Sequence, residues 1–183
     1  YVDLNSDGHW WVPSGRIFLS PDTDDTPEQE LAYACQHFFL PLRRRDPFGV
    51  EASTTYDPYD LLMVETRDAL GNRITVGERL ADGHINPSKP GNDYRVLKPW
   101  RVMDPNHSRS QVAFDILGMV VGNAVMGKPE DDHGDSLDSF AADLPEDVIL
   151  EHLRNPLADP LRLLGQATSR LVYDLFAYQR TQG

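Results

Sequence analysis

The sequence is poor in cysteine and contains no long apolar run. Cys35 is its only cysteine, so no disulfide can form within the chain and no zinc site can be built from cysteines. The longest apolar run, residues 116–121, is interrupted by Gly118 and is much shorter than the roughly 18 residues that span a bilayer. These absences exclude a disulfide framework and predict no membrane insertion by this segment.

Basic residues are also few. The chain has 17 Lys and Arg residues against 29 Asp and Glu residues, which gives a net charge of −12. Proteins whose main task is to neutralise phosphate backbones have the opposite balance, so nucleic acid is not expected as a partner. The one basic run, residues 43–45, stands against Asp46 and is predicted to be a solvated cluster at a strand edge.

Motifs of catalysis are absent as well. The sequence has no G-x-S-x-G elbow and no glycine-rich phosphate loop. Its six histidines are dispersed, and none forms an H-E-x-x-H or H-x-x-x-H spacing. We therefore predict that the chain is not an enzyme.

Two helical segments are predicted. Thr26 is the expected N-cap of the first, with Pro27 at the first helical position and Gln29 completing a capping box. The apolar residues before Pro41 recur at helical spacing, which predicts a buried face and an inert, buried thiol, with these members: Leu31, Ala34, Cys35, Phe38 and Phe39. The second segment begins near residue 145 and includes a helix that is capped by Asp159 and stops at Gly165.

Elsewhere the apolar period is two, which predicts strands around 10–12, 16–19, 53–56, 63–66, 73–76 and 111–114. The predicted fold class is mainly β, an antiparallel meander with two helical insertions. Its expected parts are N-terminal strands plus a helix over 1–43, repeats over 44–126 with a loop insertion at 77–91, an acidic loop and helical insertion over 127–167, and a resumed repeat strand over 168–183.

A short phrase recurs in this meander. Residues 45–49, Arg-Asp-Pro-Phe-Gly, return as residues 67–71, Arg-Asp-Ala-Leu-Gly, and residues 104–106, Asp-Pro-Asn, open a third copy. Aromatic-Asp pairs stand at 56–57, 114–115 and 173–174. A period of about twenty residues is typical of stacked units that cannot bury their apolar faces alone. The repeat therefore predicts an architectural role.

Each residue type in the repeat has a structural use. Asp, Pro and Gly are turn residues, since Asp can bond backbone two residues on, Pro presets φ and Gly accepts positive φ. We expect the aromatic residue to face inward from a strand and the Asp after it to bond the next turn. Catalytic carboxylates would need two different environments around one substrate, whereas these aspartates recur with the structural period.

The combined phrases resemble a known family. Residues 55–57, 67–72, 93–97, 102–106 and 112–120 are similar to the Rhs/YD-repeat region in the B component of insecticidal toxin complexes, large proteins that begin with a Salmonella virulence-plasmid-like domain. The similarity covers most of the chain. Since the sequence begins with Tyr1, we expect a piece of a longer polypeptide.

The resemblance implies a section of wall in a large hollow β-shell. In that family the shell joins the C component and encloses a toxic segment until delivery through the pore-forming A component. Expected partners are thus the rest of the parent polypeptide and other toxin-complex components, in a secreted or extracellular setting. The sequence departs from the pattern at Phe114-Asp115 and Tyr94-Arg95 and lacks the aspartate-protease-like signature of Rhs cores, so self-cleavage is not expected.

One motif suggests a metal. Asp3, Asn5 and Asp7, followed by Gly8, have the D-x-N-x-D-G spacing that can place three side-chain oxygens around calcium. An EF-hand would have Glu at its twelfth position, where Ser14 stands. A calcium loop of another kind and a plain Asx turn both remain open.

Two other functions are compatible with these residues. A calcium-dependent carbohydrate-binding or adhesive β-module would use Trp10, Trp11 and Trp100 as stacking platforms. A metal-dependent hydrolase would use Asp3 and Asp7 with a further partner. The leading hypothesis is a structural segment of a secreted toxin component.

Overall fold

The computed structural model describes residues 2–12, 14–131 and 133–182. The chain divides into two compact units, a first unit of Tyr1–Val76 and a second unit of Gly77–Gly183. Antiparallel strands dominate both units, and the helices are short. The predicted fold class, mainly β with antiparallel pairing, is therefore confirmed.

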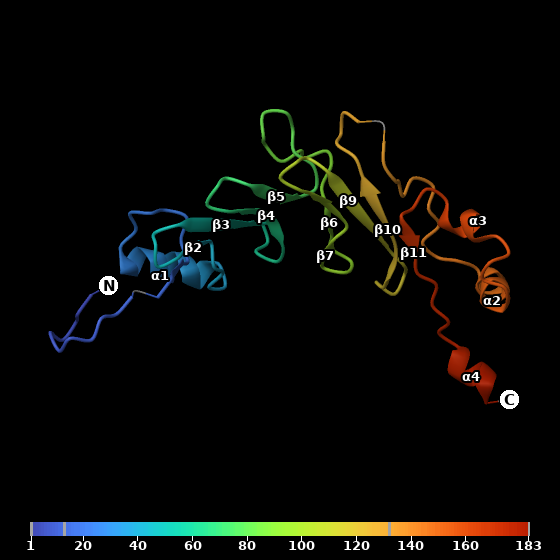
Figure 1. Ribbon diagram of the computed structural model, residues 1–183, viewed down its shortest axis with the longest axis horizontal. Helices are drawn as coiled ribbons and strands as arrows, with labels where there is room; N and C mark the ends of the chain where they lie inside the picture. The colour runs from blue at the N-terminus through green and yellow to red at the C-terminus, as the bar shows by residue number, and fades with distance from the viewer. Residues whose placement is uncertain (1, 13, 132, 183) are drawn as a thin grey trace. The chain divides into compact units, whose positions relative to one another are not determined.

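The first unit is an antiparallel meander with one helix (Figure 1). Its strands pair in the order β1-β2-β3-β4-β5. The helix α1 comes between β1 and β2 in the chain. The bounds are β1 Arg16–Phe18, α1 Pro27–Gln36, β2 Arg43–Arg45, β3 Glu51–Tyr56, β4 Met63–Arg67 and β5 Arg73–Val76.

The second unit continues the same kind of pairing in the order β8-β9-β10-β11, beside a separate hairpin of β6 and β7. Helices α2 and α3 lie between β10 and β11 in the chain, and α4 follows β11. The bounds are β6 Asn92–Asp93, β7 Lys98–Pro99, β8 Arg101–Met103, β9 Arg109–Phe114, β10 Val120–Met126, α2 Glu146–Arg154, α3 Pro160–Leu164, β11 Ser169–Arg170 and α4 Ala177–Thr181.

The helix start predicted at Thr26 is confirmed, but the buried face is wrong. The Thr26 side chain and the Gln29 side chain form the reciprocal capping box. Of the expected apolar face only Ala34 is buried, and Cys35 is exposed. The reason is that the helix ends at Gln36 and both Phe38 and Phe39 have positive φ, so the helical spacing does not continue to Pro41.

The basic run at 43–45 does not lie at a strand edge, as the sequence suggested. It forms β2, which pairs with β1 on one side and β3 on the other. Arg43 lies opposite Phe18, and the guanidinium carbons of Arg16, Arg43 and Arg45 lie 4.4, 4.5 and 4.9 Å from the centre of the Phe18 ring. The guanidinium of Arg45 also donates from Nε to Glu51 Oε1 at 2.6 Å. The arginines therefore pack around the buried aromatic ring of this sheet.

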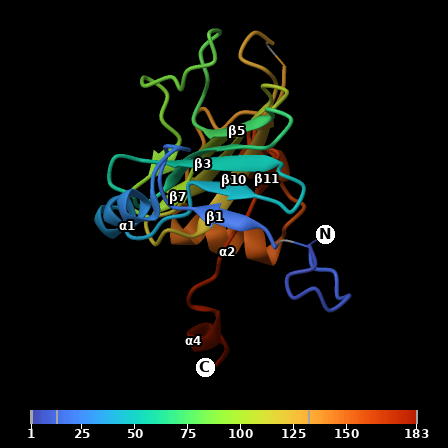
Figure 2. The same ribbon diagram turned by 90° about the vertical axis from the view of Figure 1, so that its left-hand side faces the viewer.

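A buried carboxylate anchors the inserted loop of residues 77–91. The Glu78 side chain is 4% exposed and lies 3.0 Å from Lys89 Nζ, 2.9 Å from Arg101 Nη1 and 3.5 Å from Arg109 Nη1. Burial lowers the pKa of Arg101, and the charge of Glu78 opposes this shift. The rest of the loop extends beyond the strand ends, as do residues 127–131 (Figure 2). The inserted loop is thus tied to β8 and β9 by charge at its base.

The Phe140 ring is one link between the helical segment and the sheet of the second unit. The Phe140 ring lies against Gly122 so closely that a Cβ there would be 2.4 Å from Cζ. The guanidinium carbon of Arg170 lies 3.9 Å from the centre of the same ring, and its Nη1 donates to the Leu163 carbonyl at 2.7 Å. Burial lowers the pKa of Arg170. Gly122 and Arg170 therefore hold Phe140 and the helical segment on β10.

The hydrophobic core is small in both units. Among the described residues, the buried apolar side chains of the first unit are Phe18 and Ala34. Those of the second unit are Met103, Phe114, Val121, Ala124 and Ala167. Many large apolar side chains are exposed instead, including Ile17 and Ile74 on the strands of the first unit. Backbone pairing and polar contacts thus carry much of the order in these sheets.

We predict that Gly91→Ala destabilises the second unit by about 2 kcal/mol or more, because overpacking without room to relax is costly. A Cβ on Gly91 would lie 2.1 Å from the Gly77 nitrogen and 2.3 Å from the Arg101 carbonyl oxygen. The matched control is Gly49→Ala, where the only cost is positive φ, about 1 kcal/mol. Urea unfolding compares the two, and equal effects would contradict the close approach at Gly91.

Candidate functional site

Five aspartates begin the reversals that connect the long strands. They are Asp46, Asp57, Asp68, Asp104 and Asp115, and we call the reversals the Asp corners. In the Asp115 corner, the Asp115 amide donates to the Met119 carbonyl at 3.0 Å and the Gly118 amide donates to the Asp115 carbonyl at 3.0 Å. The amides of Leu117 and Met119 then donate to Asp115 Oδ1 at 2.9 and 2.8 Å. One side chain thus fixes two amides of its own turn.

The same pattern recurs at the other corners. At Asp46 the carboxylate accepts from the amides of Phe48 and Val50, at 2.8 and 2.9 Å. At Asp68 it accepts from the amides of Leu70 and Asn72, both at 2.9 Å. The Asp104 carboxylate accepts from the Ser108 amide at 2.8 Å, and the Asp57 carboxylate from the Leu61 and Leu62 amides at 2.8 and 3.1 Å. The predicted turn role of these aspartates is therefore confirmed.

The fourth residue of every Asp corner has positive φ. It is Gly49, Gly71 or Gly118 in three corners, with φ between 79° and 84°, and Asp60 or His107 in the other two, with φ of 56° and 68°. A residue in this region lets the chain turn back into an antiparallel partner with the strand twist intact. Glycine adopts it at little cost, so three of the five corners use glycine.

The spacing of the corners corrects the repeat read from the sequence. The aspartates fall at 46, 57 and 68, and again at 104 and 115, so each step of eleven residues is one strand and one corner. In the pairs at 56–57 and 114–115, the Asp is the first residue of the turn that follows its strand, and it accepts from the amides of that turn. Across the three aromatic-Asp pairs, the aromatic side chain is buried at Phe114, half-buried at Tyr56 and 38% exposed at Tyr173.

Four corners place an apolar residue at the tip. The third residue is Phe48, Tyr59, Leu70 or Leu117, and its exposed fraction is 87%, 66%, 88% or 63%. Polar residues would serve a solvated turn equally well, since the carboxylate already satisfies the turn amides. The sequence analysis did not identify these apolar tips, although the recurrence of an apolar residue two positions after the Asp is visible in the sequence.

The predicted calcium ligands lie in an exposed loop that its own carboxylates hold. The two oxygens of Asp3 accept from the amides of Asp7 and Gly8, at 3.1 and 3.0 Å. Asp7 Oδ1 accepts from the His9 amide at 3.0 Å, and hydrogen bonds with that amide lower the pKa of Asp7. A side-chain hydrogen bond links Asn5 to Asp7 as well. Asx turns of this kind explain the D-x-N-x-D-G spacing without a metal. Calcium binding at this loop stays a prediction.

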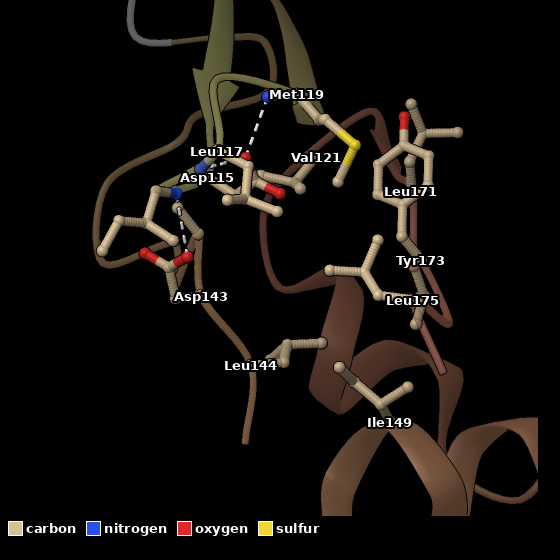
Figure 3. Close-up of a pocket in the computed structure, with 13 residues that line it drawn as sticks. Asp115, Leu117, Met119, Val121, Asp143, Leu144, Ile149, Leu171, Tyr173 and Leu175 are labelled. Carbon is tan, nitrogen blue, oxygen red and sulfur yellow. Dashed lines mark hydrogen bonds between the residues drawn. The ribbon is translucent and has the colours of Figure 1, made fainter. Parts of the chain in front are cut away.

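An apolar pocket of about 130 Å³ lies next to the Asp115 corner (Figure 3). The corner contributes Leu117 and Met119, residues 142–149 contribute one wall, and Leu171, Tyr173 and Leu175 face it from the opposite side. Asp143 Oδ1 accepts from the Ile116 amide at 3.0 Å, and the Tyr173 hydroxyl donates to the Val120 carbonyl at 2.9 Å. The pocket therefore shows an Asp corner packed against other apolar segments.

The tryptophans proposed for carbohydrate binding are divided between the two units. Trp10 and Trp11 belong to the first unit and are exposed, and the strand predicted there is reduced to a single bridge between Val2 and Trp11. Trp100 belongs to the second unit, where the Arg101 guanidinium carbon lies 4.5 Å from its ring centre. No group of three acidic, histidine or cysteine side chains within 2–12, 14–131 and 133–182 is arranged to hold a metal. Over the same residues, no helix is long and apolar enough to cross a membrane.

Comparison with known proteins gives little further information. No family model and no curated protein matches the chain. The chain is similar to a chain in the solved structure named "Crystal Structure of TcdB2-TccC3-Cdc42", with 18% identity and a TM-score of 0.39. The match covers 80% of this chain and 8% of the other, so this chain spans a small part of that neighbour's length.

Removal of one corner carboxylate tests its contribution. We predict that Asp115→Ala destabilises the second unit by about 2 kcal/mol, because two amides lose a charged acceptor. Asp115→Asn keeps an oxygen in place and should lose less than half of that. The matched control is Asp82→Ala, which removes a carboxylate that accepts from the single His84 amide of an exposed loop. Chemical unfolding measures all three, and equal losses for Asp115→Ala and Asp82→Ala would contradict the corner role.

The charge of a corner carboxylate predicts a pH dependence. The side-chain amide of Asn72 lowers the pKa of Asp68, and the backbone amides of the turn act in the same direction. A carboxyl with a lowered folded-state pKa stabilises the fold above its ordinary pKa of 3.8, and this stabilisation is lost as the pH falls through the folded-state value. Asp68→Asn should therefore reduce the loss of stability between neutral pH and acid. An unchanged slope in unfolding free energy against pH would contradict this role for Asp68.

Proposed function

We propose that this chain is a structural segment of a secreted Rhs-type toxin component, which helps to form a β-shell around a toxic cargo. The observation that carries the proposal is the repetition of one Asp corner at steps of eleven residues. A repeated unit that pairs only with its neighbours is the basis of extended walls, because each added strand presents the next pairing edge. The chain supplies wall and has no active site of its own.

The disposition of the carboxylates supports this role. At all five corners the Asp side chain is engaged by amides of its own turn. General acid and base catalysis needs carboxyl groups in different environments that converge on one substrate. The corner aspartates differ in burial, from the buried Asp57 and Asp115 to the exposed Asp68, but each bonds amides of its own turn. Their carboxylates bind backbone amides.

The large exposed surface supports a covered position in a larger assembly. The chain exposes 12672 Å². A folded monomer of 20.7 kDa exposes about 8,900 Å², and two separate domains of half that mass expose about 10,700 Å². The excess includes the corner tips Phe48 and Leu70, which belong to neighbouring hairpins at one end of the first unit's sheet. Surfaces of this kind are typical of interaction sites.

The more specific part of the proposal, the toxin family, is supported by the sequence motifs. The relation to the B component of insecticidal toxin complexes rests on residues such as 67–72 and 112–120, which form the Asp68 and Asp115 corners. We propose that the partners are the rest of the parent polypeptide and other components of the toxin complex. The secreted setting is part of the same proposal.

The test uses the full-length parent polypeptide with its cargo. We predict that the triple variant Asp46→Ala, Asp57→Ala and Asp68→Ala makes the cargo digestible by an added protease, because the wall loses three corners. The matched control replaces the same three residues by Asn, which keeps an acceptor oxygen, and its cargo should stay protected as in the wild type.

Two results would contradict the proposal. One is a cargo that remains protected in the Ala variant, and the other is a catalytic activity of this chain that the Asn variant abolishes with its fold intact.

A further inference from the structure

A second cavity lies in the first unit, between the end of α1, the strands β2 and β3, and the Asp57 corner. Its volume is about 430 Å³, within the range of small-molecule sites. The helix contributes Tyr33, its C-cap residue is His37, the strands contribute Arg43 and Ser53, and the corner contributes Asp60. The wall formed by β2 and β3 is polar because Arg43 and Ser53 are directly paired across the strands and project from the same face.

The centre of this cavity is a histidine-aspartate pair. His37 Nδ1 lies 2.8 Å from Asp60 Oδ2, and the two side chains are 33% and 23% exposed. The pair joins two elements that the sequence separates by 23 residues. With Nδ1 engaged by the carboxylate, the tautomer of His37 is fixed and Nε2 is left for another partner.

Asp60 occupies a position where this chain otherwise favours glycine. It is the fourth residue of the Asp57 corner, with φ of 56°, and the equivalent residues of three other corners are Gly49, Gly71 and Gly118. A side chain in this region costs on the order of 1 kcal/mol relative to glycine. Backbone strain of this kind clusters at functional sites. Here the strained residue provides the carboxylate that holds His37.

Aromatic and hydroxyl groups complete the lining. The Tyr33 ring is stacked on the His37 ring, with centroids 4.0 Å apart and planes inclined by 17°. The Tyr56 phenol is half-buried, burial raises its pKa, and its hydroxyl donates to the Pro41 carbonyl at 3.4 Å. Ser53 and Thr55 add hydroxyl groups from the strand. The cavity thus offers flat apolar faces and donors and acceptors around them.

The charges in the cavity determine the class of ligand. A guanidinium from Arg43 and a carboxylate from Asp60 line the same space, so an anion would face Asp60 and a cation would face Arg43. An uncharged ring with neighbouring hydroxyls can donate to the Asp60 carboxylate, form hydrogen bonds with the hydroxyls of Ser53 and Thr55, and place its C–H face on the aromatic rings. We propose that this cavity binds a neutral saccharide ring, with Asp60 and His37 as the hydroxyl-binding pair.

The site is independent of the wall function and uses neither the tryptophans nor calcium. The probes are glucose, galactose, mannose and N-acetylglucosamine, each at millimolar concentration, with acetate and methylguanidinium as charged probes. Saturation-transfer NMR on the whole chain detects binding, and the ring resonances of His37, Tyr33 and Tyr56 report its place. The expected result is transfer to at least one sugar, with shifts in those rings.

The decisive variant is Asp60→Gly, which removes the carboxylate and restores the residue found in the sister corners, so the fold should be as stable as wild type or more so. It should weaken sugar binding about tenfold, as expected for loss of a hydrogen bond to a charged group. The matched control is His107→Gly, which relieves the same backbone strain at the Asp104 corner and should bind like the wild type. Absence of transfer to all four sugars, binding by a charged probe alone, or unchanged binding in Asp60→Gly would overturn the proposal.

Discussion

The hydrogen bonds between an aspartate and the amides of its own turn are the constraint on which the rest of this chain depends. A reversal between antiparallel strands leaves backbone amides that no ladder partner can satisfy. At Asp46, Asp68 and Asp115 a single carboxylate oxygen accepts two of them. Since the corner then depends on one side chain and one residue of positive φ, the remaining turn positions are free to vary.

That freedom explains two other features of the chain. The first is the apolar tip, because Phe48 and Leu70 are not needed to form their turns and are available for contact. The second is the small core. Strands that are fixed by their corners and by polar contacts, such as the arginines around Phe18 and the cations around Glu78, need less apolar burial to stay in register. Both features suit a segment that is completed by neighbouring structure.

Much of the meander could be predicted from the sequence, and the errors have physical causes. Local pattern and chemistry predict the strands at 53–56, 73–76 and 111–114 and the capped helix start at Thr26.

The predicted buried face of α1 was wrong because positive φ at Phe38 and Phe39 is decided by the chain beyond the helix. The arginines at 43–45 were assigned to a strand edge because no local signal shows that β1 pairs outside them. The pairing of His37 with Asp60 was invisible for the same reason, since only the fold brings them together. Calcium at Asp3, Asn5 and Asp7 remains a prediction, because the observed turn uses the same oxygens.

Residue-resolved hydrogen exchange tests the central claim most directly. In four corners the amide four residues after the Asp donates to the Asp carboxylate. These amides belong to Val50, Asn72, Ser108 and Met119. If the Asp corners organise the chain, these four amides exchange slowly and with similar protection, well below the rate of the exposed loop amide of His84. Exchange of all four at the rate of an unstructured peptide would contradict the account.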